Sequence, residues 1–285
     1  AIRVNNPQSS QLLLILRLLS GVLRVHGSVD GASFRPMKNY FREDLTLYGN
    51  SWSKELPKLI SEDVEINDVA EFVEVTKFRN AKFFREFLFE LTNALHQKNK
   101  GSEIGAFVFI YRCVEKVSFA LPLTYVSQTE EFYGAFDSLK KLFGNSGKGG
   151  ELSFFRHFIK QVYRDDPLKD SSIDIVFSGA SEQEQRAYFN SAKKICRPEM
   201  VGPNTETDRI LSLPFLEVGN FLVVLRNRFF HMLHGQSNNI QSHEIFDADT
   251  FFGFFNDKFL YWLSSLFLSV ISQNMSDYQS NSGVS

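Results

Sequence analysis

Apolar residues recur three and four positions apart along most of this 285-residue chain, and this spacing limits the fold more than any other feature. It places one apolar stripe along each of a series of helices, which can then pack together. The clearest stripe lies in residues 75–97, where it includes Phe87, Leu91 and Leu95. Further helices are predicted over residues 9–25, 103–126, 130–142, 152–163, 182–195, 211–234 and 248–272.

Other segments carry weaker signals. Residues 40–75 mix short apolar pieces with turn formers and acids, which predicts short helices or irregular structure. Pro122 is expected to kink or end its helix, and a short strand is expected at residues 173–177. The prediction is an all-α fold in three parts, namely a mostly helical N-terminal extension at 1–100, a helical bundle at 101–273 and a mobile tail at 274–285.

Phenylalanine is unusually abundant, with 30 residues in the chain. Many stand in adjacent pairs, and such rings fill either a buried core or an interface between subunits. The core is the preferred interpretation, and the interface is kept as the alternative. The pairs are Phe83-Phe84, Phe154-Phe155, Phe229-Phe230, Phe251-Phe252 and Phe254-Phe255.

Charge and cysteine content exclude several classes of protein. A net charge of −2 gives no general attraction to long nucleic acids, although one focused RNA site is compatible with it. The two cysteines have neither zinc-ligand nor disulfide-framework spacing, so a reduced, cytoplasmic compartment is expected.

Residues 12–19 lack the pattern of a signal peptide, and the polar residues at 256–258 interrupt the most apolar segment. No membrane span is therefore predicted.

A polar cluster lies inside the apolar segment 221–234 and needs a physical reason. Arg226, Asn227 and Arg228 follow five consecutive apolar residues, and His231 comes three residues later. An arginine buried in such a helix is costly unless it is paired. The cluster is therefore either a satisfied network of structural hydrogen bonds or a site that binds an anion.

These residues resemble the motif of the HEPN ribonucleases, in which an arginine, often followed by asparagine, precedes a histidine by a few positions. Arg226, Asn227 and His231 match this pattern. The resemblance covers about residues 103–273 and implies a HEPN-like helical bundle. It also implies endonuclease chemistry without a metal or cofactor, in which the RNA 2'-hydroxyl attacks the adjacent phosphate and leaves a cyclic phosphate end.

The resemblance also implies a role for each residue. His231 would be the general base or acid, Arg226 would hold the phosphate, and Asn227, one turn before His231, would orient either group. On an ideal helix Arg226 and His231 point about 140° apart, and the family solves this by forming a homodimer with a composite site. Arg228 and His234 also fit the spacing, and are expected to support phosphate binding.

A second element supports the resemblance. Tyr111, Arg112 and Glu115 are similar to a Tyr-Arg-x-x-Glu element found in an earlier helix of HEPN domains. The alternative is a plain ion pair between Arg112 and Glu115 on a solvated helix face, since side chains three positions apart are neighbours.

Three functions follow as hypotheses. The first is an RNA-cleaving toxin or antiviral defence effector, as in bacterial toxin–antitoxin and abortive-infection systems, with an antitoxin or sensor protein as a further partner. The second is a non-catalytic helical module that binds proteins or RNA. The third is a metal-dependent nuclease that uses the acidic pairs Asp165-Asp166 and Asp247-Asp249, although these are expected to be solvated loop residues and helix caps.

Overall fold

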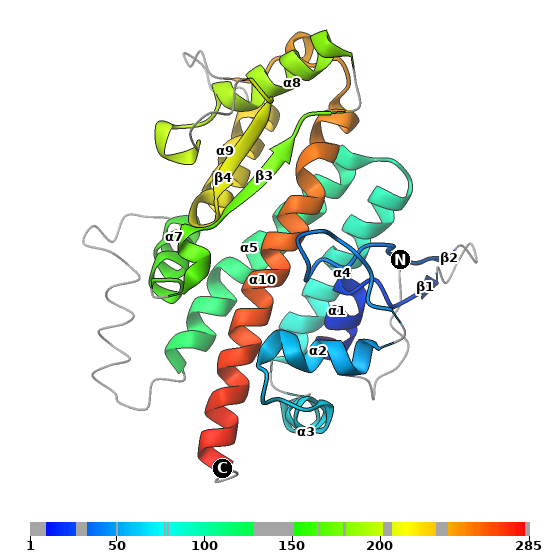
Figure 1. Cartoon of the computed structure of the whole chain (residues 1–285), viewed down its shortest axis with the longest axis vertical. Helices are drawn as coiled ribbons and strands as arrows, with labels where there is room; N and C mark the ends of the chain where they lie inside the picture. The colour runs from blue at the N-terminus through cyan, green and yellow to red at the C-terminus, as the bar shows by residue number, and fades with distance from the viewer. Residues whose placement is uncertain are drawn as a thin grey trace.

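The structure is a computed structural model that describes most of the chain (Figure 1). The predicted helix at 130–142 lies outside the described residues. The structure describes residues 10–26, 33–49, 51–76, 78, 80–127, 151–164, 166–178, 181–201, 207–231 and 239–282.

Three long helices form the centre of the molecule: α4 (Ala81–Asn99), α5 (Glu103–Ser127) and α10 (Ala248–Ser282). Helices α4 and α5 follow each other directly and pack together, and α10 packs against α5. The turn between α4 and α5 uses Gly101 at φ 78°, a backbone conformation that favours glycine. The helical class predicted from the apolar spacing is confirmed.

Of the two outcomes expected at Pro122, a kink or an end of the helix, the end does not occur, because α5 continues through to Ser127. A proline inside a helix removes one backbone hydrogen bond and tends to kink the helix. The neighbouring Val117, Leu121 and Pro122 are buried, and their burial offsets that loss. The packing of this turn therefore outweighs the local preference of proline.

Helix α10 is longer than the sequence indicated. Its predicted end was residue 272, whereas the structure continues the helix through Ser282. At 1.5 Å per residue, its 35 residues span about 52 Å, and Figure 1 shows it running down the length of the molecule. Residues 274–282, predicted as a mobile tail, have a helical backbone.

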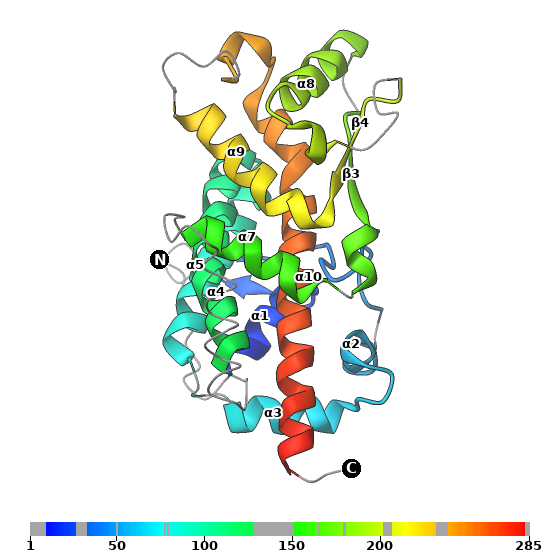
Figure 2. The same ribbon diagram turned by 90° about the vertical axis from the view of Figure 1, so that its left-hand side faces the viewer.

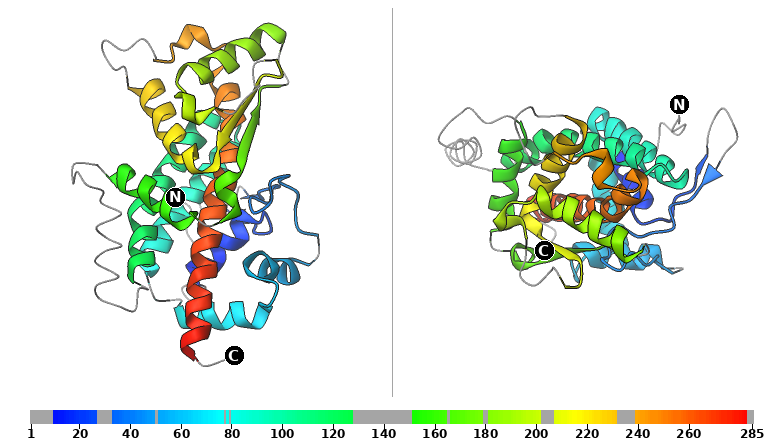
Figure 3. Two further views of the ribbon diagram at one scale, coloured as in Figure 1. Left: turned by 60° about the vertical axis from the view of Figure 1, so that its left-hand side comes forward. Right: turned by 90° about the horizontal axis from the view of Figure 1, so that it is seen from above.

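Five further elements complete this part of the chain: α7 (Glu151–Val162), β3 (Ser172–Val176), α8 (Glu182–Lys194), β4 (Ile210–Pro214) and α9 (Val218–Phe230). Figure 1 shows α7 at about mid-height and the other four in the upper part of the molecule. Strands β3 and β4 pair antiparallel, with Ile173 opposite Leu213 and Ile175 opposite Leu211. Figure 3 shows α7 and this strand pair on different sides of α10. Short 3-10 helices occur at Pro167–Asp170, Pro198–Met200, Phe215–Glu217 and Ser242–Glu244.

The strand β4 corrects the prediction of one helix over 211–234. Leu211 and Leu213 are buried, while their neighbours Ile210, Ser212 and Pro214 are partly exposed, which is the two-residue alternation of a strand. The predicted strand at 173–177 is confirmed as β3, and it supplies the partner that β4 requires. Helix α9 therefore begins only at Val218.

The N-terminal hundred residues pack onto the same core as the rest. Helix α1 (Gln11–Leu19) lies against α4, while α2 (Trp52–Ile60) and α3 (Ile66–Thr76) lie against α10. The short strands β1 (Val25–His26) and β2 (Ser33–Phe34) pair antiparallel. One hydrophobic cluster includes buried side chains from both sides of residue 100.

Ion pairs attach the N-terminal segment to α10. Asp257 bonds with Lys38, lies 3.1 Å from Lys98 Nζ, and accepts a hydrogen bond from the Tyr40 hydroxyl at 3.0 Å. Burial raises the pKa of Asp257, but the charges of Lys98 and Lys38 outweigh it and lower the pKa overall. The carboxylate is therefore ionised and joins three segments that are distant in the sequence.

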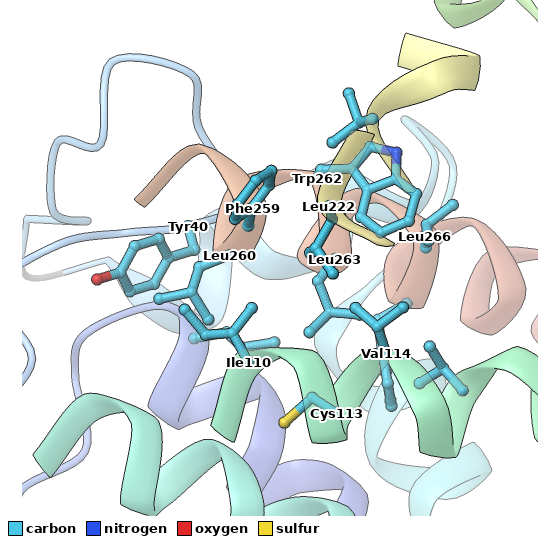
Figure 4. Close-up of a cluster of buried hydrophobic side chains, with 14 of the residues drawn as sticks. Tyr40, Ile110, Cys113, Val114, Leu222, Phe259, Leu260, Trp262, Leu263 and Leu266 are labelled. Atoms are coloured by element: carbon cyan, nitrogen blue, oxygen red, sulfur yellow. The ribbon is translucent and has the colours of Figure 1, made fainter. Parts of the chain in front are cut away.

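Most of the paired phenylalanines lie in the core or pack against it, as the preferred interpretation predicts. Phe251, Phe252 and Phe255 on α10 are fully buried. Figure 4 shows α5, α9 and α10 meeting around Leu222 and Trp262, with Tyr40 reaching the same cluster. Phe230 is the exception among the described pairs, with 40% of its surface exposed.

Candidate active site at the end of helix α9

Helix α9 is held firmly where it begins. The carboxylate of Glu217, immediately before the helix, is buried and contacts Lys160 Nζ at 3.0 Å and Arg156 Nη2 at 3.2 Å. Burial raises the pKa of Glu217, but hydrogen bonds from Asn220 and Lys160 and the charge of Arg156 lower it overall. Helix α9 is thereby tied to α7 by an ionised carboxylate.

One face of α9 packs against the core. Its buried side chains include Phe221, Leu222 and Leu225, and Gly219 lets the indole of Trp262 approach closely. Figure 2 shows α9 crossing α10 at the upper end of the molecule. On another side of α9, Arg226 meets α5.

Arg226 is half-buried between α9 and α5. Its Nη1 donates a hydrogen bond to Asn227 Oδ1 at 2.9 Å, and its guanidinium carbon lies 5.0 Å from the centre of the Tyr111 ring. A guanidinium at this distance is attracted by the face of the ring. The two elements that were singled out in the sequence, at 111–115 and 226–231, therefore meet in space.

The surroundings of Tyr111 reflect this contact. Burial raises the pKa of the Tyr111 hydroxyl, the charge of Arg226 opposes the increase, and Glu115 adds to it. Glu115 itself is exposed on α5. Arg226, Asn227, Tyr111 and Glu115 thus form a polar cluster to which two helices contribute.

Arg112 takes a different place from the one predicted. Its Nη2 lies 2.8 Å from Glu90 Oε1 on α4, and its guanidinium carbon lies 6.0 Å from the centre of the Phe109 ring. Among the described residues, no ion pair joins Arg112 to Glu115, so the plain helix-surface pair was the wrong alternative. Glu90 is the partner that the sequence did not indicate, because it belongs to another helix.

Arg228 carries an unused donor. The side chain is half-buried, and its Nη1 is buried without a hydrogen-bond partner in the described structure. Leaving a buried charged donor unsatisfied costs free energy, on the order of 1–3 kcal/mol or more. An anion bound at this position would remove that cost.

His231 lies just beyond the helix, which corrects the prediction that the helix continues to 234. Helix α9 ends at Phe230, and His231 has an extended backbone with φ −117° and ψ 113°. Its backbone N–H donates to Asn227 O at 3.2 Å, and its side chain is exposed. The structure records no contact between His231 and Arg226 within the described region, and His234 lies outside that region.

The acidic pairs act as caps, as expected. Asp166 accepts a hydrogen bond from Leu168 N at 2.8 Å, Asp247 accepts one from Thr250 N at 2.6 Å, and Asp249 accepts one from Ile104 N at 2.8 Å. Asp165 lies outside the described residues. Within the described part of the chain, no three His, Cys, Asp or Glu side chains are grouped so that they could hold a metal ion.

The fold and the site together define a mostly helical protein with a cationic, partly buried cluster where α5 and α9 meet. In the parts of the chain that the structure describes, no helix is both long enough and apolar enough to cross a membrane. No protein-family model matches the chain, and the comparisons with curated proteins and with solved structures found no match.

Proposed function

We propose that this protein is a metal-independent endoribonuclease of the HEPN type that works as a homodimer. The 2'-oxygen of the RNA attacks the adjacent phosphorus and the bond to the 5'-oxygen breaks. The 2'-hydroxyl loses a proton and the departing 5'-oxygen gains one. The products are a 2',3'-cyclic phosphate and a 5'-hydroxyl.

The observation that carries this proposal is the pairing of Arg226 with Asn227 beside Tyr111. The asparagine oxygen and the tyrosine ring hold the guanidinium in one orientation, while its remaining donors stay available for a phosphate. An arginine held in this way before substrate binds loses little freedom when the charge of the transition state develops. The unused donor of Arg228 supports an anion site at the same end of α9.

His231 supplies the proton transfers in this proposal. An imidazole has an ordinary pKa near neutral pH and serves as either acid or base. The exposed position of His231 beyond the helix lets it reach RNA bound across the end of α9. A second chain brings a second His231 to the same site, so that one histidine accepts the proton and the other donates it.

Exposed apolar side chains near the site and further along α5 support contact with a second copy. Phe230 stacks on Phe107 with ring centres 6.0 Å apart, yet 40% of its surface is exposed. Val108, Phe119 and Leu123 on α5 are also exposed, and their spacing of eleven and four positions places them along one side of the helix. Aromatic side chains at such positions are enriched in protein interfaces.

The decisive experiment is incubation of the purified chain with RNA in EDTA, with the product ends analysed. We expect cleavage with 2',3'-cyclic phosphate ends, and a loss of about 10²–10⁴-fold in rate for His231→Ala. His243→Ala is the matched control, because His243 is also exposed but lies in a different segment. Intact RNA, or an unchanged rate for His231→Ala, would overturn the proposal, and inhibition by EDTA would instead indicate a metal-dependent nuclease.

Arg226→Lys tests the phosphate-binding role. A lysine keeps the positive charge. It lacks the planar fork of donors that lets an arginine bond to Asn227 and hold a phosphate with two parallel hydrogen bonds at the same time. We expect a loss of about 10²-fold or more in rate with little change in the temperature of unfolding. A lysine variant as active as the wild type would contradict this role.

The exposed face of α5 favours a second candidate, a non-catalytic helical module that binds protein or RNA. In that case Phe119→Ser and Leu123→Ser would abolish association, and His231→Ala would have no effect. For the enzyme we further propose a cytoplasmic toxin or antiviral defence effector, held inactive by an antitoxin or sensor protein. We expect expression of the wild-type chain to arrest growth, and we expect His231→Ala to relieve that arrest.

A further inference from the structure

A second cationic feature lies between α8 and the segment that leads into β4. It is a pocket of about 380 Å³, and Figure 2 shows β4 and the C-terminal end of α9 on opposite sides of the upper part of α10. The pocket is therefore separate from the candidate active site. Its lining consists of Arg186, Phe189, Asn190, Lys193, Thr207 and Arg209.

The charges of this α8–β4 pocket are unbalanced. Arg186 and Arg209 both bond to one carboxylate oxygen of Glu182, at 3.3 Å and 2.7 Å. Glu182 is exposed, and the lining residues that the structure describes include no acidic side chain. Two arginines therefore share one carboxylate oxygen, which leaves one positive charge in excess within this group of three side chains.

The backbone at Arg209 supplies an independent observation. Its φ is 52°, a left-handed backbone conformation that costs free energy for a residue other than glycine. The strain is held in place on both sides, because Arg209 O accepts a hydrogen bond from Phe177 N at 3.3 Å and Arg209 Nη1 donates to Gln185 Oε1 at 3.0 Å. Backbone strain of this kind concentrates where side chains clamp a ligand.

We propose that the α8–β4 pocket binds the diphosphate or triphosphate group of a ligand the size of a nucleotide. Arginine donors match the geometry of phosphoryl oxygens, and the amide of Asn190 and the hydroxyl of Thr207 supply further donors. The volume falls within the range of about 300–1,000 Å³ that is usual for small-molecule sites. This inference does not depend on the ribonuclease proposal.

The test is calorimetric titration of the full chain with inorganic pyrophosphate, ATP and adenosine, all in EDTA. Pyrophosphate and ATP are expected to bind, and adenosine is not. Affinity should fall as salt is raised, because salt screens the attraction. Arg186→Gln and Arg209→Gln should each weaken pyrophosphate binding about 10-fold, which corresponds to one hydrogen bond to a charged group.

Two further variants make the test specific. Glu182→Gln removes the carboxylate that competes for both arginines, and it should strengthen binding about threefold. Lys58→Gln makes the same charge change as Arg186→Gln at an exposed position on α2, and it should have no effect. The side chain of Arg186 is 65% exposed, so its replacement leaves the fold intact even if Arg209→Gln does not.

Three results would overturn the inference. The first is absence of binding by pyrophosphate and ATP at millimolar concentration. The second is equal affinity of the wild type and Arg186→Gln. The third is displacement of pyrophosphate by a single-stranded RNA oligonucleotide but not by ATP, which would assign the pocket to RNA.

Discussion

Gly219→Ala tests whether the close packing of α9 on α10 positions the candidate site. A Cβ atom at residue 219 would lie 2.8 Å from Trp262 Cη2, 3.1 Å from Trp262 Cζ2 and 3.9 Å from Ile159 Cδ1. The first two distances are shorter than ordinary contacts. The indole cannot easily move aside, because it is fully buried and its Nε1 donates to Phe215 O at 3.1 Å.

Two opposing effects determine how much Gly219→Ala changes the free energy of unfolding. Alanine is favoured over glycine inside a helix by about 1 kcal/mol, whereas an added methyl group in a tightly packed core costs about 1–3 kcal/mol. The net expectation is a loss of about 1 kcal/mol, and at most about 2 kcal/mol, in the free energy of unfolding. For a chain of this size that lowers Tm by roughly 2–5 °C.

Urea unfolding followed by circular dichroism measures the effect, and Gly253→Ala provides the control. Residue 253 also lies inside a helix, but its added Cβ would meet Glu103 Cγ at an ordinary 3.5 Å. Gly253→Ala should therefore leave the stability unchanged or raise it by up to about 1 kcal/mol. The reasoning is refuted if Gly219→Ala is as stable as Gly253→Ala.

A double-mutant cycle identifies the clashing group. Trp262→Phe removes the ring atoms nearest to residue 219, so Gly219→Ala should cost less in that background than in the wild type. Equal costs in both backgrounds would show that the tryptophan is not the obstacle.

Three further predictions concern stability and reactivity. Burial raises the pKa of Glu217, but its ion pairs and hydrogen bonds lower it overall. Its contribution to stability is therefore complete above about pH 4.5 and is lost as pH falls through the folded-state pKa, so acid unfolding curves of Glu217→Gln and wild type should converge between about pH 5 and pH 3. Ser181→Ala removes the side-chain cap of α8 and should cost about 1 kcal/mol, whereas Ser51→Ala, at a residue that forms no such cap bond, should not alter the urea midpoint. Burial raises the pKa of Cys113 and raises that of Cys196 to about 12, so thiol reagents at pH 8 should label the protein rapidly only in denaturant, and fast labelling of the native chain would contradict this.

The sequence predicts the helices well where their stability is local. The apolar residues of α4 recur at helical spacing, and Phe87, Leu91 and Leu95 are all buried as the pattern requires. Strand β4 was missed because Leu211 and Leu213 adjoin the apolar start of α9, and only pairing with β3, about 40 positions earlier, makes this segment a strand. Tertiary pairing therefore overrides the local pattern.

The candidate site was only partly predictable for the same reason. The motif placed Arg226 and Asn227 on a helix, and the structure agrees. Nothing in the spacing indicates that the helix ends at Phe230, so the direction of His231 could not be derived. In the α8–β4 pocket, Arg186 and Arg209 come together only when the chain folds. No pattern in the linear sequence indicates that they are neighbours.

The position of α10 also has a consequence for how the chain folds during synthesis. Ser272 donates a hydrogen bond to Ile60 O across 212 positions, and Lys38 bonds to Asp257 across 219. Because a ribosome makes the N-terminal part first, α2 and α3 emerge long before the helix on which they pack. Their apolar faces must stay exposed to solvent, or to a chaperone, until α10 has been synthesised. Slowing translation before residue 248 should therefore increase aggregation of the nascent protein.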